Sequence, residues 1–277
     1  MNDGWTSDAP RDANLELELL LEAIYRRFHY DFRAYSRGSL HRRLTDALKA
    51  FGCATLSGLQ ERLLHDETAF PALIRYLTVQ VSDLFRDPSY FSTLRRDIVP
   101  VLCTYPSVRL WIAGCSTGEE AYSFAILLEE EGLLDRCMIY ATDINPDALA
   151  IAKAGAYSGD RLSQFEKNHG ASGARTPLSN HYTLAHGSAY FNRNLRRKIL
   201  FSDHSLATDG GFAEMQLISC RNVLIYFDRS LQNRALDLFK ESLCRRGFLG
   251  FGLQESLRFT AREHSFSELT ERWYQGC

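Results

Sequence analysis

The sequence predicts a doubly wound α/β domain preceded by an all-α module, and three observations carry this prediction. A short apolar run at 108–113 leads into a glycine-containing turn and then an amphipathic helix at 119–131. A second apolar strand at 138–142 ends at Asp143. The first 85 residues show only the helical spacing of apolar residues. Strand, glycine turn and helix form the unit from which open parallel sheets build a ligand pocket at the carboxyl ends of their strands.

Composition bounds the class of protein. The 277 residues allow one large domain or two small ones, and 45% hydrophobic and 24% charged residues are ordinary for a globular chain. The net charge of -2 argues against general nucleic-acid binding. No apolar run approaches the roughly 20 residues that span a bilayer, and the N-terminus lacks the regions of a signal peptide. Seven cysteines without a C-x-x-C pair indicate reduced thiols. We therefore expect a cytoplasmic protein without a metal site or membrane insertion.

Four helices are expected in the N-terminal module, at 14–28, 39–51, 56–64 and 70–79. Asn14 and Ser39 are the expected N-caps of the first two, and Gly52 is expected to end the second. The module would therefore cover residues 1 to about 85 with no strand.

Positive charge is concentrated in this module. Between Arg26 and Lys49 there are seven basic and two acidic residues, hence a net +5. We place Arg42 and Arg43 on the face opposite the leucines of the second helix. The run is either a solvated helix face or a docking surface for an acidic partner, and its composition leaves both interpretations open.

The glycine turn predicts the kind of ligand. A phosphate would need the positive end of the helix free, but its first turn carries Glu119 and Glu120, which occupy that end and repel anions. A ligand with an amine fits better. Asp143, at the end of the next strand, lies where a carboxylate holds ribose hydroxyls. Ribose with an amine and no phosphate indicates S-adenosylmethionine (AdoMet), and the alternative is a turn that binds nothing.

The α/β alternation is interrupted after the second strand. A helix is expected at 145–155 and is followed by residues 157–198, which contain a loop-like stretch at 168–177 and a small hairpin at 181–192. Insertions of this length in compact domains are functional more often than incidental. The remaining elements are strands at 199–202 and 215–220, a helix at 230–243, a strand at 247–253 and one further element within 262–274.

Four motifs occur together and in order: L-F-R-D-P-x-x-F (84–91), G-C-S-T-G-E-E-A-Y-S (114–123), A-T-D-I-N (141–145) and C-R-N-V-L-I-Y-F-D (220–228). In these motifs the chain closely resembles the CheR family, AdoMet-dependent methyltransferases that esterify glutamates of bacterial chemoreceptors. The resemblance extends from about Leu19 to about Tyr274. It implies an all-α receptor-docking domain (1–85) and a Rossmann-like AdoMet-binding domain (86–277) with a small antiparallel β-subdomain inserted at about 157–198. It also favours the docking interpretation of the positive charge.

The resemblance implies roles for individual residues. Glu120 would face the amine of the methionine, Arg86 its carboxylate or the acceptor glutamate, and Asp143 the ribose. Arg86, Arg221 and Tyr226 would be the catalytic residues, the last two by orienting the acceptor. By residue type alone Cys115 is a packing residue. The positions implied to line the cofactor are Gln80, Ser82, Arg86, Gly114, Cys115, Glu120, Asp143, Ile144, Ser205, Leu206, Arg221 and Asn222.

The sequence departs from the family pattern in two places. Ser205-Leu206 stands where many members have Asn-Leu, which puts one adenosine contact in doubt. G-L-Q-E at 252–255 stands where G-H-S-E is usual, and we expect little effect on the chemistry. The insertion aligns poorly, so its role in binding a receptor tail peptide stays open.

The implied function is transfer of the AdoMet methyl group to chemoreceptor glutamates, which leaves S-adenosylhomocysteine (AdoHcy). A glutamate is already ionised at neutral pH, so this reaction needs no general base. One alternative is a non-catalytic AdoMet- or AdoHcy-binding scaffold. A nucleic-acid methyltransferase is disfavoured because amino-methylating members carry an N/D-P-P-Y type motif, which C-R-N-V-L-I-Y is not.

Overall fold

The computed structural model describes residues 11–257, 260, 263–270 and 272–276, and the chain divides into two compact units. One unit contains the chain up to Val79 together with 205–209 and 224–235. The other contains 80–204, 210–223 and the chain from Leu236 onward. Each unit is described by itself.

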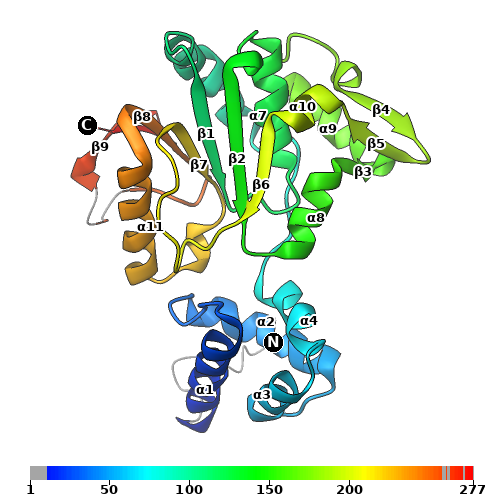
Figure 1. Ribbon diagram of the computed structural model, residues 1–277, viewed down its shortest axis with the longest axis vertical. Helices are drawn as coiled ribbons and strands as arrows, with labels where there is room; N and C mark the ends of the chain where they lie inside the picture. Colours follow the sequence, from blue (N-terminus) through cyan, green and yellow to red (C-terminus); the bar gives the residue numbers. More distant parts are fainter. Residues whose placement is uncertain (1–10, 258–259, 261–262, 271, 277) are drawn as a thin grey trace. The chain divides into compact units, whose positions relative to one another are not determined.

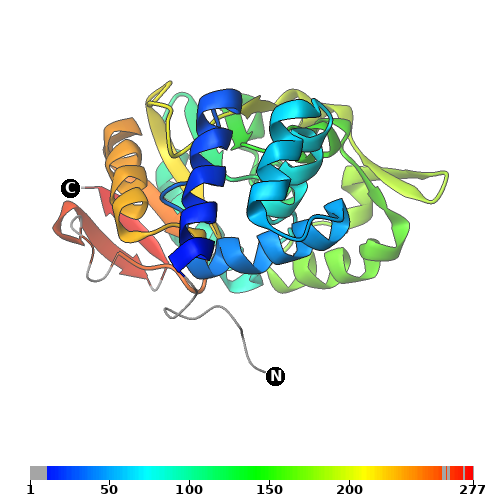
Figure 2. The same ribbon diagram turned by 90° about the horizontal axis from the view of Figure 1, so that it is seen from below.

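The first unit is built from four helices, seen from below in Figure 2: α1 (Arg11–Phe28), α2 (Arg37–Phe51), α3 (Leu56–His65) and α4 (Ala69–Leu77). The short helix η5 (Leu224–Tyr226) belongs to the same unit. Leu17, Leu20, Leu21 and Ile24 form the buried face of α1, as their spacing predicts. The four predicted helices are thus confirmed.

The predicted helix starts need correction. α1 begins at Arg11, three residues before Asn14. α2 begins at Arg37, after Ser36, and Ser39 lies inside it, because the Leu40 amide donates to the Ser36 carbonyl and closes the first turn earlier. The predicted end is confirmed: Gly52 adopts φ 66° and its amide donates to the Lys49 carbonyl.

The prediction that Arg43 lies on the solvent face of α2 is wrong, because Arg43 is buried. It follows Leu40 by three residues and precedes Ala47 by four, and this spacing places all three on the buried face of the helix. Its guanidinium donates to the Leu77 carbonyl and lies 4.3 Å from the ring centroid of Tyr226. Burial lowers the pKa of Arg43. Arg42 is exposed.

The second unit is organised around a seven-stranded sheet with the strand order β6-β2-β1-β7-β8-β10-β9 (Figure 1). The five strands from β6 to β8 are parallel, and β10 pairs antiparallel with β8 and β9. The expected strands are confirmed, but the C-terminal region contributes two strands where a single element was predicted. The bounds are β1 (Val108–Ala113), β2 (Cys137–Asp143), β6 (Ile199–Asp203), β7 (Met215–Cys220), β8 (Leu243–Phe251), β9 (Phe266–Thr270) and β10 (Trp273–Gly276).

Helix α7 (Glu119–Glu130) is buried along almost its whole length. Every residue from Ala121 to Leu128 is buried, not only the predicted stripe. The reason is that other elements of the unit cover α7 on the side away from the sheet (Figure 1). The other helices and short helical turns are α5 (Pro88–Thr93), η1 (Leu94–Ile98), α6 (Val99–Leu102), η2 (Leu134–Arg136), α8 (Pro146–Ala154) and η6 (Glu263–Ser265). Helix α11 (Arg229–Ser242) is divided between the two units after Ala235.

The predicted insertion carries a second, antiparallel sheet with the order β3-β5-β4, which stands at one side of the main sheet (Figure 1). The hairpin around His186-Gly187 is confirmed. The stretch 168–177 is not all loop, because α9 continues to Ala171 and the tertiary contacts of Asn168 and His169 override the local glycine. The elements are β3 (Ala156–Ser158), η3 (Gly159–Arg161), α9 (Leu162–Ala171), η4 (Leu178–His181), β4 (Tyr182–Ala185), β5 (Ser188–Phe191) and α10 (Arg193–Arg197).

No helix in the described part of the chain is both long and apolar enough to cross a bilayer.

Candidate functional site

The glycine turn lies between β1 and α7, at the carboxyl end of the parallel strands. Gly114 has φ +74°, and a Cβ on it would lie 2.3 Å from Cγ2 of Val223. Gly118 has φ +93°, and a Cβ there would lie 2.7 Å from Cβ of Ala152. Both positions therefore require glycine. The turn is fixed to β2, because the amides of Gly114 and Cys115 both donate to the Thr142 carbonyl at 2.8 Å.

Asp143 faces the glycine turn from the end of β2. Its two carboxylate oxygens accept from the Ser116 amide at 2.8 Å and the Asn145 amide at 2.9 Å. Burial raises the pKa of Asp143, and these amide donors offset part of that effect. Ile144 follows and is half-buried. Cys115 is buried, which raises the pKa of its thiol well above the ordinary value and keeps it protonated, as a packing residue would be.

Glu120, in the first turn of α7, is held from β7. Its Oε1 accepts from the Ser219 hydroxyl at 2.6 Å, and its Oε2 accepts from the Arg221 guanidinium at 3.0 Å. The Ser219 hydroxyl is also 2.7 Å from the Tyr90 hydroxyl, and the Tyr90 ring stacks on Trp273 at 4.4 Å. Two predicted site residues, Glu120 and Arg221, are thus brought together with Ser219 and Tyr90, which sequence reasoning missed.

Arg221 is almost inaccessible, with 1% of its side chain exposed. Besides Glu120, its guanidinium donates to the Arg86 carbonyl at 2.6 Å and to Asp87 at 2.9 Å, and it lies 4.2 Å from the Tyr90 ring centroid. Burial alone would lower its pKa, but Glu120, Tyr90 and Asp87 outweigh that effect and raise it. Its Nε has no hydrogen-bond partner among the described residues.

The segment 82–87 runs beside the glycine turn and is held through its backbone. The Phe85 amide donates to the Ser123 hydroxyl at 2.7 Å, and the carbonyls of Ser82, Leu84 and Arg86 accept from the side chains of Arg161, Asn168 and Arg221. Phe85 and Asp87 adopt positive φ values of 49° and 58°.

Leu84 and Phe85 of this segment are fully buried, whereas its polar side chains are partly accessible. The half-buried guanidinium of Arg86 makes only a long contact of 3.5 Å, with the Val81 carbonyl, in the described structure. Ser82 and Gln80, also predicted for the site, are half-buried as well.

Glu255 is a second residue that sequence reasoning undervalued. It is buried, and it accepts from the amides of Asn222 at 2.7 Å, Val223 at 2.8 Å and Gly252 at 2.9 Å. It therefore fixes the predicted residue Asn222 in its strained conformation, with φ 59°. The signal was present in the sequence: this glutamate is the last residue of the G-L-Q-E segment.

Three predicted residues belong to the other unit. The Tyr226 ring packs against Arg43, and its carbonyl accepts from the Ser36 amide at 2.8 Å. Leu206 is buried, and the Ser205 hydroxyl accepts locally from the Ala207 amide at 3.3 Å. Tyr226, Ser205 and Leu206 thus belong to the first unit, whereas Glu120 and Arg221 belong to the second.

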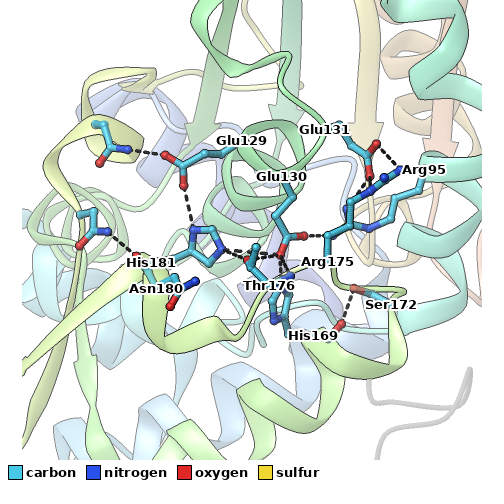
Figure 3. A network of polar contacts seen from close by, with 12 residues as sticks. Arg95, Glu129, Glu130, Glu131, His169, Ser172, Arg175, Thr176, Asn180 and His181 are labelled. Carbon is cyan, nitrogen blue, oxygen red and sulfur yellow. Dashed lines mark hydrogen bonds and ion pairs between the residues drawn. The ribbon is translucent and has the colours of Figure 1, made fainter.

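The far end of α7 carries a second polar cluster (Figure 3). The side chain of Glu130 is fully buried. One of its oxygens is bonded by Arg95, and the other accepts from the Thr176 hydroxyl at 2.8 Å and from His169 at 3.1 Å. His181 is 2.8 Å from Glu129 and 3.0 Å from the Thr176 hydroxyl. Glu131 pairs with Arg95 and Arg175 at 2.8 Å.

These contacts shift two pKa values in opposite directions. Burial alone would raise the pKa of Glu130, but its donors hold it far below the ordinary range. Burial alone would lower the pKa of His181, but Glu130 and Glu129 outweigh it and raise that pKa. Glu130, His169 and His181 have ligand-type atoms within 4.8 Å of one another, so by type they could hold a metal ion.

Two family models match the chain. "CheR methyltransferase, SAM binding domain" matches residues 80–274, and "CheR methyltransferase, all-alpha domain" matches residues 15–78. The first model confirms AdoMet as the cofactor, and the two together confirm the resemblance.

Curated relatives agree with these models. Putative methyltransferase Cher3 of Pseudomonas putida is 53% identical over 261 residues, which cover 94% of this chain and 96% of that one. An uncharacterized 104.1 kDa protein of Rhodobacter capsulatus is 32% identical over 87% of this chain and 25% of its own length. A chemotaxis protein methyltransferase of Listeria innocua is 29% identical over 82% of this chain and 84% of its own length.

Proposed function

The chain belongs to the CheR methyltransferase family, and from this premise we propose that it transfers the methyl group of AdoMet to glutamate side chains of chemoreceptors, forming methyl esters. The observation that carries the proposal is the Glu120–Arg221 pair at the carboxyl edge of the sheet, where Arg221 also donates to the Arg86 carbonyl. The proposal places the protein in the cytoplasm, where the acceptor helices would lie, and uses 1–85 as docking domain and 86–277 as catalytic domain.

Two carboxylates would hold the cofactor. We assign Asp143 to the ribose hydroxyls, because it ends β2 opposite the glycine turn and its backbone donors favour the ionised form. We assign Glu120 to the methionine amine. Arg221 and Ser219 keep this carboxylate aligned, and 14% of its side chain stays exposed, which leaves room for a donor from the ligand.

The chemistry is a direct displacement at the sulfonium methyl by an anionic carboxylate. An anion and a cation combine and both charges disappear, so partial removal of water and good alignment favour the reaction. An arginine can align a carboxylate through two parallel hydrogen bonds. Arg86 fits that role better than Arg221, because the donors of Arg221 are already directed at Glu120, Asp87 and the Arg86 carbonyl. We therefore assign Arg221 to positioning the site.

Tyr226 is proposed to orient the acceptor, with Arg43 supporting its ring from within the first unit. If positioning dominates, Tyr226→Phe lowers the turnover number and leaves the AdoMet dissociation constant nearly unchanged. Turnover and calorimetric binding measured on the same preparation separate these effects. A large loss of cofactor affinity would contradict the assignment.

The acidic receptor helices would meet the exposed basic residues of the first unit. Several of those pair within the unit: Arg26 with Glu22, Arg33 with Asp31, and Arg37 with Glu18. Arg42 is exposed on α2. Charge reversal at Arg42 is therefore expected to weaken transfer to the receptor more than it weakens AdoMet binding.

The decisive experiment is transfer of labelled methyl from AdoMet to a chemoreceptor cytoplasmic fragment, scored for the alkali-labile fraction. Glutamate methyl esters release methanol in base, whereas N-methyl products do not. We expect alkali-labile label that disappears when the acceptor glutamates are changed to alanine. Base-stable label would refute the glutamate assignment, and AdoMet binding without transfer to any receptor fragment would favour the scaffold.

A further inference from the structure

Arg161, a residue of the insertion, contacts two segments predicted to line the cofactor. One guanidinium nitrogen lies 2.5 Å from the carboxylate of Glu119, and the other donates to the Ser82 carbonyl at 2.6 Å. Asp83 lies 3.6 Å away, and the guanidinium stands over the Phe165 ring at 4.7 Å. One side chain thus joins the start of α7, the segment 82–87 and the insertion.

Glu119 gives this contact its importance. Its side chain is fully buried, and its two oxygens accept from Arg161 and from the Thr117 hydroxyl at 2.6 Å. Glu119 directly precedes Glu120, and its carbonyl accepts from the Ser123 hydroxyl, which in turn receives the Phe85 amide. A buried carboxylate without its cation is strongly unfavourable, so the turn would have to move to reach water.

A second contact from the insertion points to the same place. The Tyr157 hydroxyl donates to the Thr117 carbonyl at 2.6 Å, inside the glycine turn. Its ring stays in the core, and burial raises the pKa of Tyr157 well above the ordinary value, so the hydroxyl remains a donor. The insertion therefore forms a direct hydrogen bond with the backbone of the glycine turn.

We propose that Arg161 is a positioning residue for AdoMet, which acts through Glu119 and Ser82 and makes cofactor affinity depend on the insertion. The inference rests on the proposed placement of the cofactor between the glycine turn and residues 80–86. The insertion in this view is part of the frame of the cofactor pocket.

The chain offers a matched control. Arg175 also lies in the insertion and also pairs with a glutamate, but with Glu131, the residue that follows the opposite end of α7, at 2.8 Å. The experiment compares Arg161→Gln, Arg161→Lys and Arg175→Gln in the full chain. It measures the AdoHcy dissociation constant by calorimetry, the AdoMet KM and kcat with a receptor fragment, and the melting temperature.

We expect Arg161→Gln to weaken AdoHcy binding about tenfold or more, the scale of a lost charged hydrogen bond. Arg161→Lys should recover part of the affinity, because an ammonium can serve one of the two acceptors. Arg175→Gln should change the AdoHcy dissociation constant by no more than roughly twofold, since it removes only a solvent-exposed ion pair, and such pairs contribute little free energy. If Arg161→Gln does not fold, Glu119→Gln tests the same pair without a buried charge and should weaken binding similarly.

Unchanged AdoHcy affinity in a folded Arg161→Gln protein, or equal weakening in Arg175→Gln, would overturn the inference. A wild-type protein that binds no AdoHcy would overturn the proposed function first and the inference with it. The two failures are thus distinguishable.

Discussion

Both ends of α7 carry glutamates, but the glutamates at the two ends serve different purposes. The first turn carries Glu119 and Glu120, and the last turn, with the residue after it, carries Glu129, Glu130 and Glu131. The positive end of the helix dipole favours carboxylates at the start and disfavours them at the end. The far end therefore needs its own cations. Arg95 and Arg175 supply two of them, and the raised pKa of His181 favours a third, the protonated imidazole.

The backbone differs as well. Around the first turn Phe85, Asp87, Ser116 and Asn222 adopt positive φ values. At the far end Gly132 and Gly173 have positive φ, which glycine adopts without strain, and the polar residues of the cluster do not. Backbone strain that the surroundings enforce is typical of binding sites. Ion pairs without such strain are typical of contacts that hold elements of the fold together. We infer from this comparison that the first turn is the ligand-binding end, whereas the far end only fixes the insertion, which Arg161 and Tyr157 also join to the first turn.

Loss of Arg95 should have the largest effect on stability. Arg95→Ala leaves the buried Glu130 carboxylate without its cation, so we expect the free energy of unfolding to fall by about 3–5 kcal/mol. Denaturant unfolding measures this, with Arg175→Ala as the control, because 64% of the Arg175 side chain is exposed and about 1 kcal/mol at most should be lost. Equal losses of unfolding free energy in both variants would contradict the special importance of the buried Arg95–Glu130 pair.

Loss of the Glu120 charge at the first turn should lower the affinity for AdoMet. Glu120→Gln removes the carboxylate that we assign to the methionine amine, so AdoMet affinity should fall about 10- to 100-fold. Glu131→Gln is the matched change at the other end and should leave affinity intact. Calorimetric titration of both variants measures the difference. If the two variants lost the same affinity, the division between the ends of α7 would be wrong.

The far end should also make stability depend on pH. The pKa of His181 is raised in the folded protein, so its contribution is fully present below the unfolded value of about 6.5 and is lost as pH rises through the folded pKa. The groups around His181 are Glu129, Glu130 and Thr176, and no cation contacts the ring among the described residues. The stability cost of His181→Asn should be greatest at pH 5–6 and shrink towards pH 8. Thermal unfolding across that range tests it, and a cost that grows with pH would reverse the sign.

Sequence reasoning predicted what depends on local patterns. The strands, the glycine turn and the hairpin follow from spacing. Asp143 and Arg221 stand at or directly after strand ends and Glu120 in the first turn of α7, and their roles at the site stay predictions. Tertiary pairs were beyond it: Arg161 and Glu119 are 42 residues apart, and no spacing links them. Arg43 was misplaced because its helix face was judged by the leucines alone, although its position beside Leu40 and Ala47 is buried.

Metal addition should have the smallest effect, and it probes the comparison most directly. Oε1 of Glu130 already accepts from the Thr176 hydroxyl and from His169, while Arg95 holds the other oxygen, so the far end is satisfied by protein groups. We expect equimolar Zn²⁺ or excess chelator to shift the melting temperature by less than about 1 °C. A bound ion at 100 times its dissociation constant would contribute about 2.7 kcal/mol, and for a chain of this size roughly 2–4 °C accompanies each kcal/mol. A stabilisation of several degrees that disappears in His169→Asn would therefore show that the far end is itself a ligand site, and the contrast between the two ends of α7 would no longer hold.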